Sequence, residues 1–212
     1  MRDEFLRSLA DHENIFGISP DTERREKLVR YYEFLTDANA NLNLVGRCSP
    51  GEFATRHVLE SLTILEFLQF NTRFADVGSG GGLPSIPCLL ARDDLSAVLI
   101  EAKEKKAAFL MRAAEELGIS DRTMVVNRQF EEVPEKDFEF VTCRALEKFT
   151  DKLPRLLKWS GKRRLLLFGG PNLETSIRKT RRKFKRKLMP LSEQRYLFIL
   201  EPDVISRSRS GS

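Results

Sequence analysis

The stretch Arg73-Phe-Ala-Asp-Val-Gly-Ser-Gly-Gly-Gly82 decides the fold of this chain of 212 residues. Its first five residues predict a short strand, and the glycines that follow predict a tight turn into a helix over 84–91. Glycine reaches positive φ at no steric cost and lets a ligand approach the backbone closely. A glycine turn between a strand and a helix therefore indicates an α/β sheet that binds its ligand at the end of this strand.

Strands and helices alternate beyond the glycine turn. Further strands are predicted over 97–101, 123–126, 138–143, 164–168 and 195–200, and a helix over 103–117 that Gly118 ends. Several of these strands are continuous apolar runs, which is typical of a parallel sheet covered on both faces. We expect an α/β fold with a mostly parallel, doubly wound sheet and helices on both faces.

The first 70 residues have a different character. Leu28, Tyr31, Tyr32 and Leu35 recur at helical spacing after a start signal at Ser19-Pro-Asp21, and Ser49-Pro-Gly-Glu52 opens a second helical stretch. We expect an N-terminal helical portion over 1–70 that packs on the core, an α/β domain over 71–204 and a flexible tail over 205–212.

Charge and cysteine content limit the classes of protein to which the chain can belong. The chain has 36 Lys and Arg against 31 Asp and Glu, a net charge of +5, so the location of positive charge matters more than its total. The three cysteines match no metal-ligand spacing, and no apolar run approaches the length of a membrane span. We expect a soluble, cytoplasmic monomer that holds no metal and contacts no membrane.

The residues around the glycines narrow the choice of ligand. Asp76 precedes the glycine loop, which predicts contacts to the ligand from Gly78, Gly80 and Gly82, and Glu101 ends the next strand, where a carboxylate can accept both ribose hydroxyls. The sixth position of the dinucleotide fingerprint is Leu83 rather than a small residue. A carboxylate at Asp76 would repel a pyrophosphate but suits an ammonium and a sulfonium. These features favour S-adenosylmethionine, while a nicotinamide or flavin site and a turn without a ligand stay open.

Residues after the third and fourth strands are candidates for the same site. Phe130 and Glu131 lie where an adenine would be reached, although a core aromatic and a solvated charge fit their spacing equally well. Arg144 ends a buried strand, where an arginine is costly without an anionic partner. We therefore favour a functional role for Arg144.

The absence of particular motifs narrows the class of methyl acceptor. The place after the fourth strand reads Cys143-Arg-Ala-Leu146, without the Pro-Pro-aromatic loop of enzymes that methylate exocyclic amines. Cys143 has no flanking proline and reads as a buried strand cysteine rather than a nucleophile. An acceptor such as guanine N7 has an in-plane lone pair and no proton to lose, so positioning does most of the work. His57 is the one histidine expected near the site, and a helix-packing role suits it equally well.

Positive charge is concentrated late in the chain, where 178–187 holds eight basic residues. Such a run supplies phosphate contacts without sequence information, although a solvated helix face is an alternative. The candidate RNA-binding residues are Arg181, Arg182, Lys183, Lys185, Arg186 and Lys187. A small-molecule methyltransferase and a non-catalytic RNA-binding protein remain the competing functions.

The chain resembles the bacterial ribosomal RNA small subunit methyltransferase G family, also called glucose-inhibited division protein B, from about Glu23 to Leu200. The matching elements are Asn43-Leu44, Arg56-His-Val-Leu-Glu-Ser61, Asp76-Val-Gly-Ser-Gly-Gly-Gly-Leu-Pro-Ser-Ile-Pro87, Lys105-Lys-Ala-Ala-Phe-Leu110, Arg128, Phe130-Glu-Glu132 and Arg144-Ala145. The resemblance implies a Rossmann-like class I methyltransferase that transfers a methyl group from S-adenosylmethionine to N7 of a guanine in 16S rRNA of the small ribosomal subunit.

The resemblance also implies roles for particular residues. Cofactor contacts are implied at Gly78, Leu83, Phe130, Glu131 and Arg144, and His57, Ser61, Arg128 and Arg144 are implied to line the cofactor or RNA site. His57, Arg128 and Arg144 are accordingly our candidates for the catalytic centre. Two positions depart from the family: Glu60 stands where an aspartate is usual, and Gly169-Gly170 stands where a Lys-Gly pair is typical.

Overall fold

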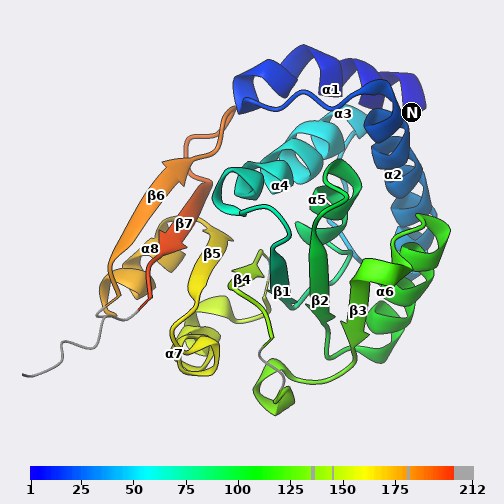
Figure 1. Cartoon of the computed structure of the whole chain (residues 1–212). Coiled ribbons are helices and arrows are strands. Elements are labelled where there is room, and N and C mark those ends of the chain that lie inside the picture. Colours follow the sequence, from blue (N-terminus) through cyan, green and yellow to red (C-terminus); the bar gives the residue numbers. More distant parts are fainter. Residues whose placement is uncertain (135–136, 145, 181, 203–212) are drawn as a thin grey trace, which may run out of the picture.

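The computed structural model describes residues 1–134, 137–144, 146–180 and 182–202. The predicted tail over 205–212 lies outside the described residues, and the division into an N-terminal portion and an α/β domain stays a prediction. Seven strands form one sheet in the order β3-β2-β1-β4-β5-β7-β6, with β3 and β6 at its two edges (Figure 1). The strands are β1 (Arg73–Val77), β2 (Ser96–Ile100), β3 (Thr123–Val126), β4 (Phe140–Cys143), β5 (Arg164–Gly169), β6 (Phe184–Leu188) and β7 (Tyr196–Leu200).

The direction of the strands confirms the predicted sheet. β1 pairs in parallel with β2 and β4, β2 with β3, and β4 with β5. β7 is antiparallel to both of its neighbours, β5 and β6. The chain leaves β1 toward β2 on one side and returns to β4 on the other, so the topological switch point lies at the carboxyl end of β1.

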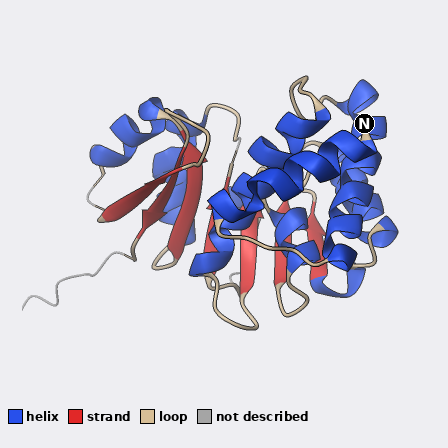
Figure 2. Ribbon diagram, turned by 90° about the horizontal axis from the view of Figure 1, so that it is seen from above, coloured by secondary structure: helices blue, strands red, loops and turns tan. Residues whose placement is uncertain are grey.

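Helices connect the strands and cover both faces of the sheet (Figure 2). They are α5 (Ser85–Ala91), α6 (Glu104–Glu116), α7 (Phe149–Ser160) and α8 (Pro171–Arg178), with short 3₁₀ turns η3 (Ser120–Arg122) and η4 (Phe130–Glu132). Side chains of α5 and α6 belong to one apolar cluster and those of α7 and α8 to another, and each cluster includes one face of the sheet. Burial on both faces explains why β1, β2 and β4 are nearly continuous apolar runs.

The N-terminal elements pack on the α5–α6 face. They are α1 (Arg2–Phe16), α2 (Thr22–Leu42), α3 (Pro50–Glu52), the π-helical segment η1 (Phe53–Leu59), α4 (Glu60–Leu62) and the 3₁₀ segment η2 (Thr63–Phe67). The start signals act as predicted: Asp21 caps α2 by accepting from the Arg24 N–H, and Ser49 and Glu52 form a capping box. The rings of Phe34 on α2 and Phe109 on α6 stack at 5.5 Å. One continuous core therefore joins the helical portion to the sheet.

The basic run near the end of the chain is not a helix face, contrary to one interpretation of the sequence. Helix α8 ends at Arg178, and Phe184–Leu188 forms the edge strand β6. Three consecutive charged residues, Lys185 to Lys187, lie between Phe184 and Leu188 in this strand, and charged side chains protect an exposed edge from pairing with another chain.

Candidate cofactor site

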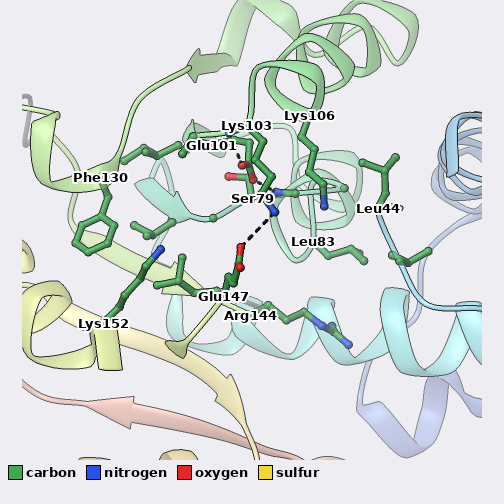
Figure 3. Close-up of a pocket in the computed structure, with 18 of the residues that line it drawn as sticks. Leu44, Ser79, Leu83, Glu101, Lys103, Lys106, Phe130, Arg144, Glu147 and Lys152 are labelled. Carbon is green, nitrogen blue, oxygen red and sulfur yellow. Dashed lines mark hydrogen bonds and ion pairs between the residues drawn. The ribbon is translucent and has the colours of Figure 1, made fainter. Parts of the chain in front are cut away.

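A cavity of about 410 Å³ opens at the carboxyl ends of β1, β2 and β4, where the topology predicts ligand binding. Its volume falls in the range typical of small-molecule sites. Six stretches of chain supply its walls, and Figure 3 shows the labelled side chains among them. The lining residues are Leu44–Gly46, His57, Val77–Gly81, Leu83, Ile100–Lys103, Lys106, Arg128–Phe130, Arg144, Leu146, Glu147 and Lys152.

The glycine loop forms the floor of the cavity in a conformation that glycine makes accessible. Gly78, Gly80 and Gly82 all have positive φ. A Cβ at Gly82 would come within 2.3 Å of the Ile86 side chain, so this position has no room for a larger residue. Gly78, Gly80 and Leu83 line the cavity, whereas Gly82 shapes the loop behind it. The loop thus offers a ligand bare backbone at the end of β1.

Glu101 lies where the sequence analysis predicts it, at the rim of the cavity after β2. One carboxylate oxygen accepts the Gly80 N–H at 2.9 Å, and the other accepts the Lys103 N–H at 2.8 Å. These bonds fix the carboxylate against the glycine loop. A carboxylate accepts about four hydrogen bonds, so capacity remains for the two hydroxyls of a ribose.

Phe130 and Glu131 lie differently in the structure. Phe130 lines the cavity and is held by an edge-to-face contact of its ring with Trp159, at 5.7 Å between centroids. Glu131 is not among the lining residues, and its carboxylate pairs with Arg155 at 3.2 Å. Arg128 is exposed and lines the same side of the cavity. Phe130 therefore suits contact with an adenine ring, whereas the Glu131 side chain faces elsewhere.

Arg144 reaches across from the end of β4 to the N-terminal helices. Its guanidinium donates to the Ser61 hydroxyl at 3.1 Å, to Glu60 at 3.1 Å and to the backbone oxygen of Arg56. The guanidinium also lies 5.2 Å from the centroid of the Phe168 ring. Burial lowers the pKa of Arg144, and the Glu60 carboxylate opposes that shift. The anionic partner expected of a buried arginine is therefore Glu60.

Glu60 holds a second arginine as well. Its side chain is 2% exposed and pairs with Arg195 at 2.7 Å and with Arg144 at 3.1 Å. One buried carboxylate thus joins α4 to the end of β4 and to the residue before β7. Removing one partner of such a group leaves an uncompensated buried charge.

His57 lines the cavity beside this ion-pair network. Burial, with the positive charges of Arg144, Arg56 and Arg195, lowers the pKa of His57 to about 3. The imidazole is neutral at physiological pH and packs against the Phe53 ring at 5.1 Å. His57 therefore contributes shape and a neutral polar group to the cavity, and no charge.

Asp76 is the sequence-predicted residue whose position differs most from expectation. It is fully buried on β1 and is not among the residues that line the cavity. Its carboxylate is therefore not exposed for direct contact with the ammonium group of a ligand. Neither carboxylate oxygen has a hydrogen-bond partner among the described residues. Burial raises the pKa of Asp76 to about 7, against the effect of the nearby Ser85 and Ser79 hydroxyls, which lower it. The link from Asp76 to the glycine loop runs through its backbone oxygen, which accepts the Ser79 hydroxyl at 2.9 Å.

The predicted RNA-binding residues separate into three groups. Lys183 and Lys185 are exposed, whereas Arg186 pairs with Glu174, and Lys187 pairs with Glu66. Arg182 corrects the prediction because its side chain is buried and donates to the backbone oxygens of residues 161, 163 and 201. It joins the ends of the surrounding elements instead of facing solvent. Arg181 lies outside the described residues.

Sequence reasoning missed part of the cavity wall. Lys103 and Glu147 form an ion pair at 3.2 Å across the mouth, and Lys106 and Lys152 point into the same space (Figure 3). Lys103 and Glu147 are 44 residues apart, so nothing in their local patterns relates them. The resemblance did offer a signal for Leu44 and Lys106, which belong to two of its matching elements and line the cavity.

Cys143 is fully buried, and burial raises the pKa of its thiol well above the ordinary range. The described residues hold no group of His, Cys, Asp and Glu side chains that could bind a metal ion. In the same part of the chain, no helix has the length and apolar character that crossing a membrane requires.

Comparison with known protein families completes the description of the site. The model of the GidB family, described as rRNA small subunit methyltransferase G, matches residues 24–194. The chain belongs to this family. It is 36% identical over 143 residues to the ribosomal RNA small subunit methyltransferase G of Azoarcus sp. (strain BH72), a match that covers 68% of each protein. The protein of that name from Sorangium cellulosum (strain So ce56) is 38% identical over 145 residues, which cover 65% of this chain and 60% of that protein.

Solved structures agree with this membership at the level of the fold. The tRNA methyltransferase TrmK of B. subtilis has a TM-score of 0.56 and 16% identity over 67% of this chain and 64% of that one. A SAM-dependent O-methyltransferase from Thermotoga maritima has a TM-score of 0.52 and 15% identity over 79% of this chain and 71% of that one. The Rossmann-like methyltransferase fold that the resemblance implied is therefore confirmed.

The Glu60 network leads to a prediction about stability. Glu60→Gln removes the charge that compensates two arginines, so the free energy of unfolding should fall by about 3 kcal/mol. The matched control is Glu66→Gln, because Glu66 is 49% exposed and its pair with Lys187 should contribute less than about 1 kcal/mol. Urea denaturation of both variants measures the difference. Equal, small losses of unfolding free energy in the two variants would contradict the assignment of Glu60 as the central charge of the network.

Asp76 leads to a prediction about pH. In the folded chain this carboxyl stays protonated up to about pH 7, whereas its ordinary value is 3.8. The stability that the protonated Asp76 carboxyl gives the folded chain is complete below pH 4 and is lost as the pH rises through 7. Between pH 5 and 8 the wild type should therefore lose roughly 2 kcal/mol relative to Asp76→Asn, which cannot ionise. Urea denaturation at both pH values gives the comparison, and a pH-independent difference would show that Asp76 is ionised throughout.

Proposed function

We propose that this chain transfers the methyl group of S-adenosylmethionine to N7 of a guanine in 16S rRNA, either free or within the small ribosomal subunit. The observation that carries the proposal is the cavity at the switch point, with Glu101 fixed against the glycine loop, in a chain of the methyltransferase G family. Such a substrate would place the reaction in the cytoplasm, and we propose that the chain acts as a monomer.

The residues present fit this cofactor. The glycine loop leaves backbone accessible beside a carboxylate that can accept ribose hydroxyls, and Phe130 lines the same cavity. A carboxylate in this position also serves the ribose of dinucleotides, so Glu101 does not separate the two kinds of ligand. Leu83, which lines the cavity where the dinucleotide fingerprint has a small residue, disfavours the nicotinamide and flavin alternatives.

Methyl transfer to guanine N7 requires few catalytic groups from the protein. The cofactor supplies an electrophilic methyl group on a positively charged sulfur. Guanine N7 attacks with an in-plane lone pair and loses no proton, so a neutral His57 is compatible with the reaction. The contribution of the chain is to hold the acceptor in line with the methyl group, which can supply a large part of the rate enhancement.

Arg144 is unsuited to contact the reacting ring directly. Methylation at N7 gives the guanine a positive charge, and an adjacent guanidinium would oppose it in the transition state. Its bonds to Glu60 and Ser61 orient it at the edge of the cavity instead. We assign Arg144 to orientation of the cofactor or to an RNA phosphate or carbonyl.

Contacts with RNA phosphates are proposed for cations in two places. Arg128, Lys106 and Lys152 lie at the cavity, where they can hold the strand that carries the target base. Lys183 and Lys185 lie on or beside the edge strand β6, away from the pocket. Such contacts fix the position of the RNA and carry no sequence information.

The direct test is transfer of labelled methyl groups to small ribosomal subunits, and to free 16S rRNA, from cells that lack this protein. Nucleoside analysis of the digested RNA should show label in 7-methylguanosine. Label in a different nucleoside would overturn the proposed target. Absence of label in RNA would favour a small-molecule acceptor or a non-catalytic RNA-binding role.

Glu101→Gln in the same assay tests the cofactor site. Loss of charge-assisted hydrogen bonds to the ribose should raise the KM for S-adenosylmethionine by about tenfold or more. Glu104→Gln, an exposed change in the first turn of α6, is the matched control and should leave the KM unchanged. Equal KM values for the wild type and Glu101→Gln would remove Glu101 from the cofactor site.

A further inference from the structure

One hydrogen bond connects the N-terminal helices to the glycine loop. The hydroxyl of Tyr31, on α2, donates to the backbone oxygen of Gly81 at 2.8 Å. Tyr31 is completely buried, and its ring packs against Phe53 with 6.2 Å between centroids. Gly81 lines the cavity, so this bond ends on its wall.

The same part of the loop is closely packed from the N-terminal side. A Cβ at Gly81 would lie 3.4 Å from Leu44, an ordinary contact, but only 3.1 Å from Leu35 of α2, which would have to shift by a few tenths of an ångström. Gly81 has a negative φ, so it is this close approach, rather than the backbone conformation, that requires glycine here. Helix α2 therefore presses directly on the backbone of the cofactor loop.

The segment after α2 is also held in place by that helix. The side-chain oxygen of Asn39 accepts the N–H groups of Leu44 and Val45 at 2.7 and 3.0 Å, and its amide donates to the Val45 oxygen at 3.0 Å. Leu44 and Val45 line the cavity opposite Phe130. Two side chains of one helix, Tyr31 and Asn39, thus fix two walls of the same cavity.

Neighbouring polar groups of the loop have their own bonds. The Gly80 N–H donates to Glu101, and the Gly82 N–H donates to the Ser79 oxygen at 2.7 Å. Tyr31 is thus the side chain that bonds the Gly81 carbonyl, which lies between the bonded N–H groups of Gly80 and Gly82. Burial raises the pKa of the Tyr31 hydroxyl well above its ordinary value, so it stays a neutral donor.

We propose that Tyr31 is a positioning residue for the methyl-donor site, because its hydroxyl fixes the Gly81 carbonyl and holds the glycine loop ready to bind the cofactor. The inference rests on the proposed function for the identity of the ligand. If the loop takes its binding conformation only part of the time, the apparent Kd rises in inverse proportion to that fraction. Tyr31 touches neither the methyl group nor the acceptor, so the effect should fall on cofactor binding and not on the transfer step.

The test is Tyr31→Phe in the full chain, which removes one hydroxyl and keeps the ring. We expect the Kd for S-adenosylmethionine, measured by calorimetry, to rise about tenfold, the effect of one lost buried hydrogen bond. At saturating cofactor the kcat should stay within about twofold of the wild type, since the transfer step is untouched. Gly81→Ala, which pushes α2 away from the loop, should raise the Kd in the same way.

Tyr32→Phe is the matched control because Tyr32 is the next residue on α2. Its ring stacks on Phe5 at 5.0 Å and its hydroxyl lies beside Thr36, not the loop. This variant should bind the cofactor as the wild type does. In the absence of cofactor, hydrogen exchange at 78–82 should be faster in Tyr31→Phe than in Tyr32→Phe.

Each outcome has a definite meaning. An unchanged Kd for Tyr31→Phe overturns the inference alone, and so does an equal rise in Kd for both tyrosine variants, which would indicate a general loss of stability. Absence of saturable binding by the wild type overturns the proposed function, and with it the role assigned to Tyr31. A rise confined to Tyr31→Phe and Gly81→Ala supports both.

Discussion

The buried carboxylate of Glu60 is the interaction on which the arrangement of this site depends. Glu60 belongs to the N-terminal helices. Its carboxylate pairs with Arg144 at the end of β4 and with Arg195, the residue before β7. Burial of the Glu60 and Arg144 charges is costly, and two ion pairs with further bonds from Arg144 to backbone oxygens offset that cost. The pairing therefore fixes the helices against the carboxyl edge of the sheet.

Several properties of the cavity follow from this placement. Burial of His57, together with the positive charge of Arg144 at the cavity edge, lowers the pKa of the imidazole and keeps it neutral. The same docking of the helices brings α2 against the glycine loop, where Leu35 and Tyr31 meet Gly81. The methyl-donor site is consequently built from the sheet and the N-terminal helices together, and its geometry depends on how tightly they pack.

The sequence predicted the features that depend on local pattern. The strand and glycine turn at 73–82, the position of Glu101 after β2 and the capping of α2 by Asp21 each follow from a few neighbouring residues. Strand β6 was missed because its three consecutive charged residues, typical of a protected sheet edge, leave it neither an apolar run nor an alternating pattern. Helix α1 was missed as well, although Phe5, Leu9 and Phe16 form its buried side.

The side-chain contacts of the site could not be predicted, because they join distant parts of the chain. The burial of Asp76 depends on the N-terminal helices that cover that face of the sheet, and the pairing of Glu131 depends on Arg155 of α7. Arg182 belongs to a basic run by composition, yet the fold turns it inward onto three backbone oxygens. Local pattern thus located the loop, the acidic residue and the strand ends, and packing decided which side chains face the ligand.

The most direct test of this account is equilibrium binding of S-adenosylmethionine to the purified chain by calorimetry, with NAD as the comparison ligand. The cavity and its carboxylate predict one molecule of S-adenosylmethionine bound per chain and displaced by S-adenosylhomocysteine, and Leu83 in place of the small residue of the dinucleotide fingerprint predicts no binding of NAD. Saturable binding of NAD without binding of S-adenosylmethionine would contradict the assignment of the glycine loop to a methyl donor.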